Sequence, residues 1–198
     1  MEADINKQAQ ETDKIFMLEF VNGREMALNL RKLPQMLKIV LVNEEGPELE
    51  IIRQLFRDYE AELDENICFQ SFEKELENPL IKYGGKSAGL WLAYYNNEVA
   101  GCIGLLPLAE NAVCEMKRLY VKPAFRKYGI GRALVELILE EARAKGHKTM
   151  VLDTLPKLQA AISLYKTYGF TERDAYYHNP LEGVIYLEKK LQSAGIPI

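Results

Sequence analysis

The sequence predicts a mixed α/β fold with a central mixed sheet, antiparallel in its first half and parallel around a glycine loop, flanked by helices. Two observations lead to this prediction. Three apolar runs between residues 89 and 121 are joined by short polar connections, as in an antiparallel meander. After residue 121 the pattern changes to helix, strand, helix and two closing strands, which indicates a parallel crossover.

The N-terminal end of the chain contains a candidate β-hairpin. Residues 15–21 and 24–30 flank Asn22-Gly23, a dipeptide that favours a type I′ turn. The second arm alternates like a strand but also has helix-forming composition, so both structures stay open for it. We assign this region to an N-terminal extension, residues 1–36, which could add strands to the sheet, cover an acceptor groove or support a homodimer.

The main domain, residues 37–198, follows with its elements in a definite order. Strands are expected where short apolar runs are bounded by polar residues or glycine: 37–42, 89–95, 98–108, 112–121, 149–153, 170–173 and 184–191. Helices are expected where apolar residues recur at helical spacing: from Pro47, over 69–76, from Gly129 to Gly146, and over 156–168. Proline favours a helix start and glycine a helix end.

Composition indicates an ordinary folded protein, with 48% hydrophobic and 27% charged residues. No apolar stretch approaches the roughly 20 residues that cross a bilayer, and the polar start lacks the core of a signal peptide, so a cytoplasmic location without membrane partners is expected. An odd set of cysteines, Cys68, Cys102 and Cys114, predicts reduced thiols. Neither His147 nor His178 has a metal partner nearby in sequence, so no metal is expected.

The segment Arg126–Gly131 is the strongest functional signal, because it lies between a strand and an amphipathic helix. The first N–H groups of a helix lack intrahelical partners and carry partial positive charge, so anions bind there. Glycines let a phosphate approach the main chain. Although the chain has net charge -4, residues 117–134 contain six cations and no Asp or Glu: Lys117, Arg118, Lys122, Arg126, Lys127 and Arg132. This local patch predicts a small phosphorylated ligand and argues against nucleic acid.

Two motifs together resemble the GNAT superfamily of N-acetyltransferases over residues 37–191. They are Arg126-x-x-Gly129-x-Gly131, after the fourth domain strand, and Ala161-x-x-Leu164-Tyr165-x-x-x-Gly169-Phe170. The resemblance implies acetyl-CoA as acyl donor and an amine acceptor. It implies that amides of the glycine loop hold the pyrophosphate and that the preceding strand pairs with pantetheine, where an exposed N–H could be an oxyanion donor. The implied cofactor-binding residues are Leu119, Tyr120, Val121, Arg126, Lys127, Tyr128, Gly129, Ile130, Gly131 and Arg132.

The resemblance also implies catalytic residues. Tyr165 matches the general acid of the family, and a phenol of pKa near 10 can protonate a thiolate of pKa about 8.5–9 only slightly uphill. From helical spacing alone, packing is the better explanation of Tyr165. Glu115, fourteen positions before Gly129, is the candidate general base acting through water; the alternative is a solvated carboxylate paired with Lys117.

The acceptor side is less specific. Tyr176, Tyr177 and Asn179 precede the last strand, in a connection that borders the acceptor site in the family, although ordinary loop aromatics would look the same. One position departs from the family pattern: Leu158 stands where many members carry an asparagine that bonds the pantetheine arm. Gln159 is a candidate to replace that contact, and weaker CoA binding is the expected cost.

Two nucleotide-binding folds and one non-catalytic role are alternatives. A Rossmann site would place Asp153 on a ribose, but Leu134 occupies its third glycine position, and residues 122–128 intervene where its fingerprint has a tight turn. A P-loop fails because Gly129 is not followed by Gly-Lys-Ser/Thr at the required spacing. An acyl-CoA sensor or regulatory module without turnover stays open, although Tyr165 argues against it.

Overall fold

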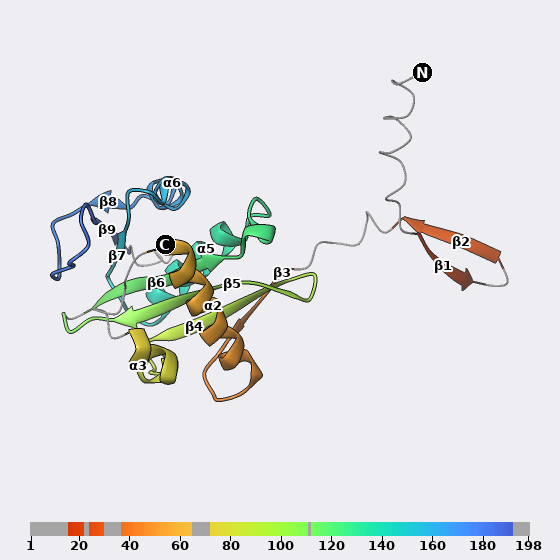
Figure 1. The fold of residues 1–198 in the computed structure, drawn as a ribbon, viewed down its shortest axis with the longest axis horizontal. Coiled ribbons are helices and arrows are strands. Elements are labelled where there is room, and N and C mark those ends of the chain that lie inside the picture. The colour runs from red at the N-terminus through yellow and green to blue at the C-terminus, as the bar shows by residue number, and fades with distance from the viewer. Residues whose placement is uncertain (1–15, 22–23, 30–36, 65–71, 111, 192–198) are drawn as a thin grey trace, which may run out of the picture. The chain divides into compact units, whose positions relative to one another are not determined.

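The computed structural model describes residues 16–21, 24–29, 37–64, 72–110 and 112–191 (Figure 1). The chain divides into two compact units, Met1–Gln35 and Met36–Ile198.

In the first unit, β1 (Phe16–Val21) pairs antiparallel with β2 (Arg24–Asn29). Val21 lies opposite Arg24, and the predicted Asn22-Gly23 turn between them lies outside the described residues. The strand alternative for the second arm is therefore the one observed.

The larger unit is built on a seven-stranded sheet of order β3-β4-β5-β6-β7-β9-β8. Neighbouring strands are antiparallel except β6 and β7, which are parallel and flank the glycine loop in sequence. The predicted mixed sheet is confirmed. Its strands are β3 (Leu37–Leu41), β4 (Gly89–Tyr95), β5 (Glu98–Pro107), β6 (Val113–Val121), β7 (Thr149–Thr154), β8 (Thr171–Glu172) and β9 (Ile185–Lys190).

The helices differ from the sequence expectation in three places, one of which is the unpredicted 3-10 turn at Pro123–Phe125. The last helix begins at Gln159 instead of Pro156, because Leu158 N–H donates to the Leu155 carbonyl (2.9 Å) in a preceding turn. A short helix after α3 was not predicted; Asn78 caps it by accepting from Leu80 N–H (3.1 Å). The helices are α2 (Pro47–Leu63), α3 (Phe72–Glu77), α4 (Pro79–Tyr83), the 3-10 turn η3 (Pro123–Phe125), α5 (Ile130–Ala144) and α6 (Gln159–Thr167).

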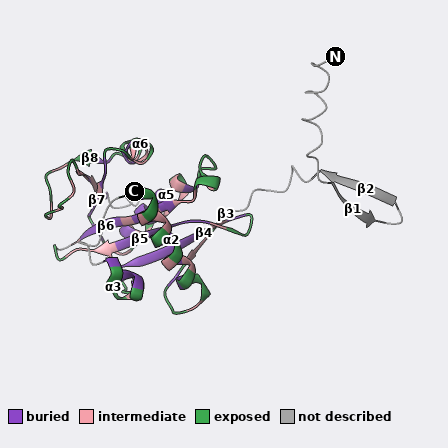
Figure 2. Cartoon of the chain, viewed as in Figure 1, coloured by how far each residue is buried: buried purple, intermediate pink, exposed green. Residues whose placement is uncertain are grey.

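Helices cover both faces of the sheet, so its central strands are buried along much of their length (Figures 1 and 2). In β4, Leu90 and Leu92 belong to the cluster that packs against α2. Trp91 and Ala93, which point the other way, belong to the cluster that packs against α5. This two-sided burial explains why β4 is an unbroken apolar run rather than an alternating one.

The sheet opens between β6 and β7. Their parallel ladder ends at Glu115 opposite Val151, although both strands continue. Within β6, Arg118 has a positive φ of 56°, and the register with β5 shifts at this point, which marks a β-bulge. Because a bulge bends its strand, the end of β6 diverges from β7 and leaves a gap at the start of α5.

Candidate active site

A cavity of about 620 Å³ lies where β6 and β7 separate. Its walls come from the end of α2, β6, the glycine loop and the segment from β7 into α6. Seven of the residues predicted from the sequence line it: Leu119, Tyr120, Val121, Arg126, Lys127, Gly131 and Tyr165. The other predicted residues lie outside this lining: Glu115, Tyr128, Gly129, Ile130, Arg132, Tyr176, Tyr177 and Asn179.

The glycine loop leaves the start of α5 open. Gly129 is the N-cap with φ 77°, a left-handed conformation that glycine adopts without strain. No side chain of the described residues caps the helix, so its first amide groups are free to meet an anion. Ile130 is buried in the core and Tyr128 lies 5.0 Å from the Tyr95 ring, centroid to centroid. These two side chains hold the loop, while Gly131 faces the cavity.

One of the six cations assigned to the basic patch does not belong to it. Arg118 is buried, and its guanidinium bonds both carboxylate oxygens of Glu75 in α3, at 2.7 and 3.1 Å. Sequence reasoning missed this because the bulge turns Arg118 away from the loop. Arg126 does lie at the loop, where it donates to the Val121 carbonyl (3.0 Å) and bonds the Glu62 carboxylate (2.5 Å).

The buried carboxylate gives a prediction about acid stability. Burial opposes ionisation of Glu75, but attraction to Arg118 and hydrogen bonds from Arg118 and Lys82 outweigh it and lower its pKa to about 2. A depressed pKa stabilises the fold above the unfolded value, 4.5, and this stabilisation disappears as the pH falls to about 2. We expect Glu75→Gln to remove up to about 3 kcal/mol of pH-dependent unfolding free energy in that window. Urea unfolding from pH 2 to 6 measures it, and parallel curves for both proteins would contradict the assignment.

Tyr165 is buried in α6 beside Phe170, with ring centroids 5.9 Å apart. It nevertheless lines the cavity, so packing and access to the cleft coexist. Burial, followed by the charges of Tyr59 and Asp153, raises the pKa of the Tyr165 phenol far above 10. Tyr165 therefore stays protonated at neutral pH, but the raised pKa makes proton transfer to a thiolate more uphill than the slightly uphill step expected from the sequence.

Glu115 lies behind the cavity wall in a closed cluster. It is 3% exposed, accepts a hydrogen bond from the Tyr176 hydroxyl (2.5 Å), and has the Lys117 ammonium at 3.1 Å. The pairing with Lys117 agrees with the alternative considered from sequence, but the carboxylate is not solvated.

From the sequence, Asp153 was considered only as the ribose partner of a Rossmann site, whereas in the structure it lines this cavity. One carboxylate oxygen accepts from the Tyr177 hydroxyl (3.0 Å) and from Asn179 Nδ2 (3.3 Å), and the other lies 3.7 Å from Lys117 Nζ. Asp153 and Lys117 both line the cavity. The available signal was a carboxylate near the end of β7, but only the gap between β6 and β7 turns that position into a cavity wall.

The position that departs from the family pattern also lies at the cavity. Leu158 and Gln159 both line it at the start of α6. The Gln159 side chain donates its Nε2 to the Pro156 carbonyl (2.6 Å). In this conformation Gln159 does not offer that amide to a ligand.

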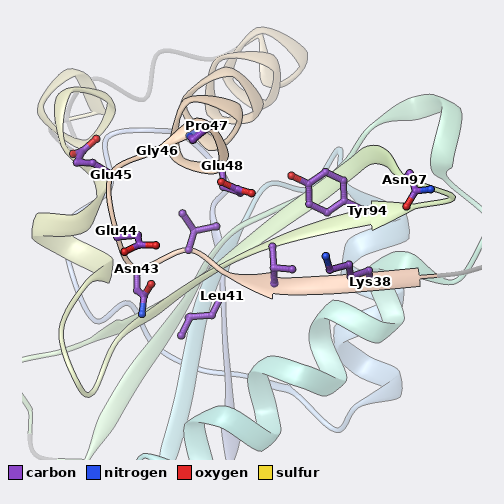
Figure 3. Close-up of a pocket in the computed structure, with 12 residues that line it drawn as sticks. Lys38, Leu41, Asn43, Glu44, Glu45, Gly46, Pro47, Glu48, Tyr94 and Asn97 are labelled. Carbon is purple, nitrogen blue, oxygen red and sulfur yellow. The ribbon is translucent and has the colours of Figure 1, made fainter.

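A second hollow, of about 440 Å³, lies along β3 and the start of α2 (Figure 3). Glu44, Glu45 and Glu48 are on its wall, with Lys38 and Tyr94. None of the predicted site residues lines it. Its acidic wall does not suit the phosphates of a CoA donor.

Metal-binding groups, thiols and membrane-spanning helices were also sought in the part of the chain that the structure describes. No group of three or more His, Cys, Asp or Glu is arranged to hold a metal ion there. Cys102 and Cys114 are buried free thiols, and Cys68 lies outside the described residues. Among the described helices, none is long and apolar enough to cross a bilayer.

The chain is similar to known proteins in sequence and in fold. Residues 49–170 match the acetyltransferase (GNAT) family. An uncharacterized N-acetyltransferase of Schizosaccharomyces pombe is 37% identical over 145 residues, which cover 73% of this chain and 89% of that protein. A GNAT acetyltransferase structure from Staphylococcus aureus covers 79% of this chain and all of its own, with TM-score 0.65 and 22% identity. A Bacillus subtilis acetyltransferase solved with CoA has TM-score 0.56 and 22% identity, covering 79% of this chain and 100% of its own. The chain belongs to the GNAT family of acetyltransferases.

Proposed function

We propose that the protein transfers the acetyl group of acetyl-CoA to a primary amine by direct attack. The observation that carries this proposal is the coincidence of three features in one cavity: the gap between β6 and β7, the uncapped start of α5, and the Tyr165 phenol. The related Bacillus subtilis fold was solved with CoA, which supports the choice of donor.

The donor would lie along the gap. Its pyrophosphate would accept hydrogen bonds from the amides of residues 129–132. Arg126 and Lys127 line the cavity and place positive charge near the pyrophosphate. Its pantetheine arm follows Leu119–Val121, where the ladder with β7 has ended and the backbone faces the cavity. The thioester then reaches the inner end of the gap, beside Tyr165.

The chemical step needs three proton and charge movements. The neutral amine attacks the thioester carbonyl carbon, the C–N bond forms, and the C–S bond breaks. A backbone N–H of β6 stabilises the oxyanion, and Tyr165 donates its proton to the departing thiolate. A carboxylate removes one proton of the incoming ammonium before the attack. The nitrogen loses a second proton as the amide forms, and the Tyr165 phenolate regains one from water, so one proton is released overall.

Two carboxylates compete for the role of base. Glu115 could act only through water, because Lys117 and Tyr176 already occupy it behind the wall. Asp153 lines the cavity directly and is oriented by Tyr177 and Asn179. Glu115 and Asp153 both pair with the Lys117 ammonium. Two negative charges therefore face one positive charge, and the remaining negative charge can attract a cationic acceptor. We therefore propose Asp153 as the group that meets the acceptor amine and Glu115 as its partner through Lys117.

Replacing each carboxylate separately tests this assignment. We expect Asp153→Asn to lower kcat/KM for the amine about 100-fold, the usual scale for a proton-transfer group, with CoA affinity unchanged. Glu115→Gln should have a smaller effect, because it leaves Asp153 in the cavity. Steady-state kinetics on both variants measure the order. The reverse order would return the role of base to Glu115.

A thiol-release assay with acetyl-CoA and a panel of amines tests the activity itself. Amine-dependent release of CoA supports the proposal. Tight CoA binding without turnover on any amine would favour the alternative, a non-catalytic acyl-CoA sensor. The acceptor panel should include amino acids, diamines and peptides with free N-termini.

A further inference from the structure

A buried ionic network lies between α3, α4 and β6, and one of its members, Arg118, also lines the cavity. The Glu75 carboxylate is 1% exposed and binds four donors from three residues. Arg118 Nε and a terminal nitrogen lie at 2.7 and 3.1 Å, Lys82 Nζ at 2.6 Å and the Tyr83 hydroxyl at 2.9 Å. None of these side chains takes part in the proposed chemistry.

The network ends on the strand that forms the cavity wall. Arg118 is the bulged residue of β6 and has a positive φ of 56°. Residues other than Gly, Asn and Asp are uncommon in this left-handed conformation. Its guanidinium lies over the rings of Phe72 (5.0 Å) and Phe56 (5.8 Å) and is fixed by two bonds to Glu75. Residues 116–121, Arg118 included, line the cavity, and the three after Arg118, 119–121, are the part proposed to lie along the pantetheine arm.

We infer that Glu75 is a positioning residue for donor binding: it fixes the Arg118 bulge and so aims the backbone of residues 119–121 into the cleft. This inference rests on the proposed function, because its main readout is CoA affinity. A two-point bond to a guanidinium fixes direction as well as distance. Glu75→Gln removes the charged partner from this two-point bond, and weaker pairing of a buried guanidinium favours rearrangement of its strand.

The network provides its own control. Lys82 binds the same carboxylate but lies on α4, away from the cleft. If the Glu75 carboxylate acts through Arg118, then Lys82→Met should change the network without moving β6. Leu49→Ala, a buried position at the start of α2, lowers stability without touching the network.

Calorimetric titration with CoA tests the inference on the full chain. We expect Glu75→Gln to weaken CoA binding at least about 10-fold. The control variants Lys82→Met and Leu49→Ala should each weaken CoA binding less than about threefold. Hydrogen exchange at amides 119–121 should accelerate in Glu75→Gln alone. Unchanged CoA affinity in a folded Glu75→Gln variant would overturn the inference, and so would an equal loss in Leu49→Ala.

A double variant guards against misfolding of the single one. Glu75→Leu with Arg118→Met replaces both charges by apolar groups, which often preserves folding. It should remain folded and still bind CoA weakly, because no directional bond holds the bulge; affinity equal to the parent protein would contradict the inference. If the parent protein itself does not bind CoA, the proposed function fails with it, whereas a parent that binds CoA beside an unaffected Glu75→Gln removes only this inference.

Discussion

Gly131→Glu is expected to abolish CoA binding in a protein that still folds. Gly131 faces the cavity in the first turn of α5, where a side chain would enter the space proposed for the pyrophosphate. Two unit charges about 4 Å apart near a protein surface repel by about 4 kcal/mol, which corresponds to roughly 1,000-fold in affinity. Calorimetric titration with CoA measures the loss.

Two variants at the same position separate charge, size and folding. A Cβ at Gly131 would lie 3.6 Å from Leu164 and 3.8 Å from Val121, ordinary contact distances, so Gly131→Ala should fold and bind CoA nearly as the parent does. Gly131→Gln should lie between Ala and Glu, because it adds bulk without charge. Normal CoA affinity in Gly131→Glu would remove the pyrophosphate site from the start of α5.

Tyr165→Phe is expected to lower kcat about 100-fold or more while changing CoA affinity less than about twofold. The variant keeps the ring that packs on Phe170 and removes only the hydroxyl that would protonate the leaving thiolate. Since the pKa of Tyr165 is raised by burial, the parent enzyme should show no loss of kcat from this group up to about pH 10.

Tyr59→Phe is the matched control for the acid. Tyr59 also lines the cavity, and burial raises its pKa to about 12, but it lies on α2. The Tyr59→Phe variant should retain most of the turnover. An unchanged rate in Tyr165→Phe would remove the acid assignment, and equal losses in both variants would point to a general effect of cavity polarity.

The order of elements could be predicted because it depends on local pattern. The apolar runs of β4 to β6 and the helical spacing of α5 are properties of short windows of sequence. The helix start at the glycine loop was equally predictable, since a glycine before a run of apolar residues at helical spacing is a local pattern; its binding of an anion stays a prediction. The start of the last helix at Gln159 was not predictable, because proline at 156 also favours a helix start and the sequence does not show the Leu155–Leu158 turn that comes first.

The inner wall of the site was less predictable. Arg118 counts as a loop cation by position in sequence, yet the bulge sends it to Glu75, 43 positions away along the chain. Asp153 lines the cavity only because β6 and β7 separate after Glu115 and Val151. Both features depend on contacts between distant segments, which a single sequence does not reveal.

A crystal structure of the protein with bound CoA tests the central claim most directly. We expect the pyrophosphate within hydrogen-bonding distance of amides between Gly129 and Arg132, the pantetheine arm beside Leu119–Val121, and the thiol next to the Tyr165 hydroxyl. A CoA molecule bound elsewhere, such as in the hollow along β3, with the gap between β6 and β7 empty, would contradict it.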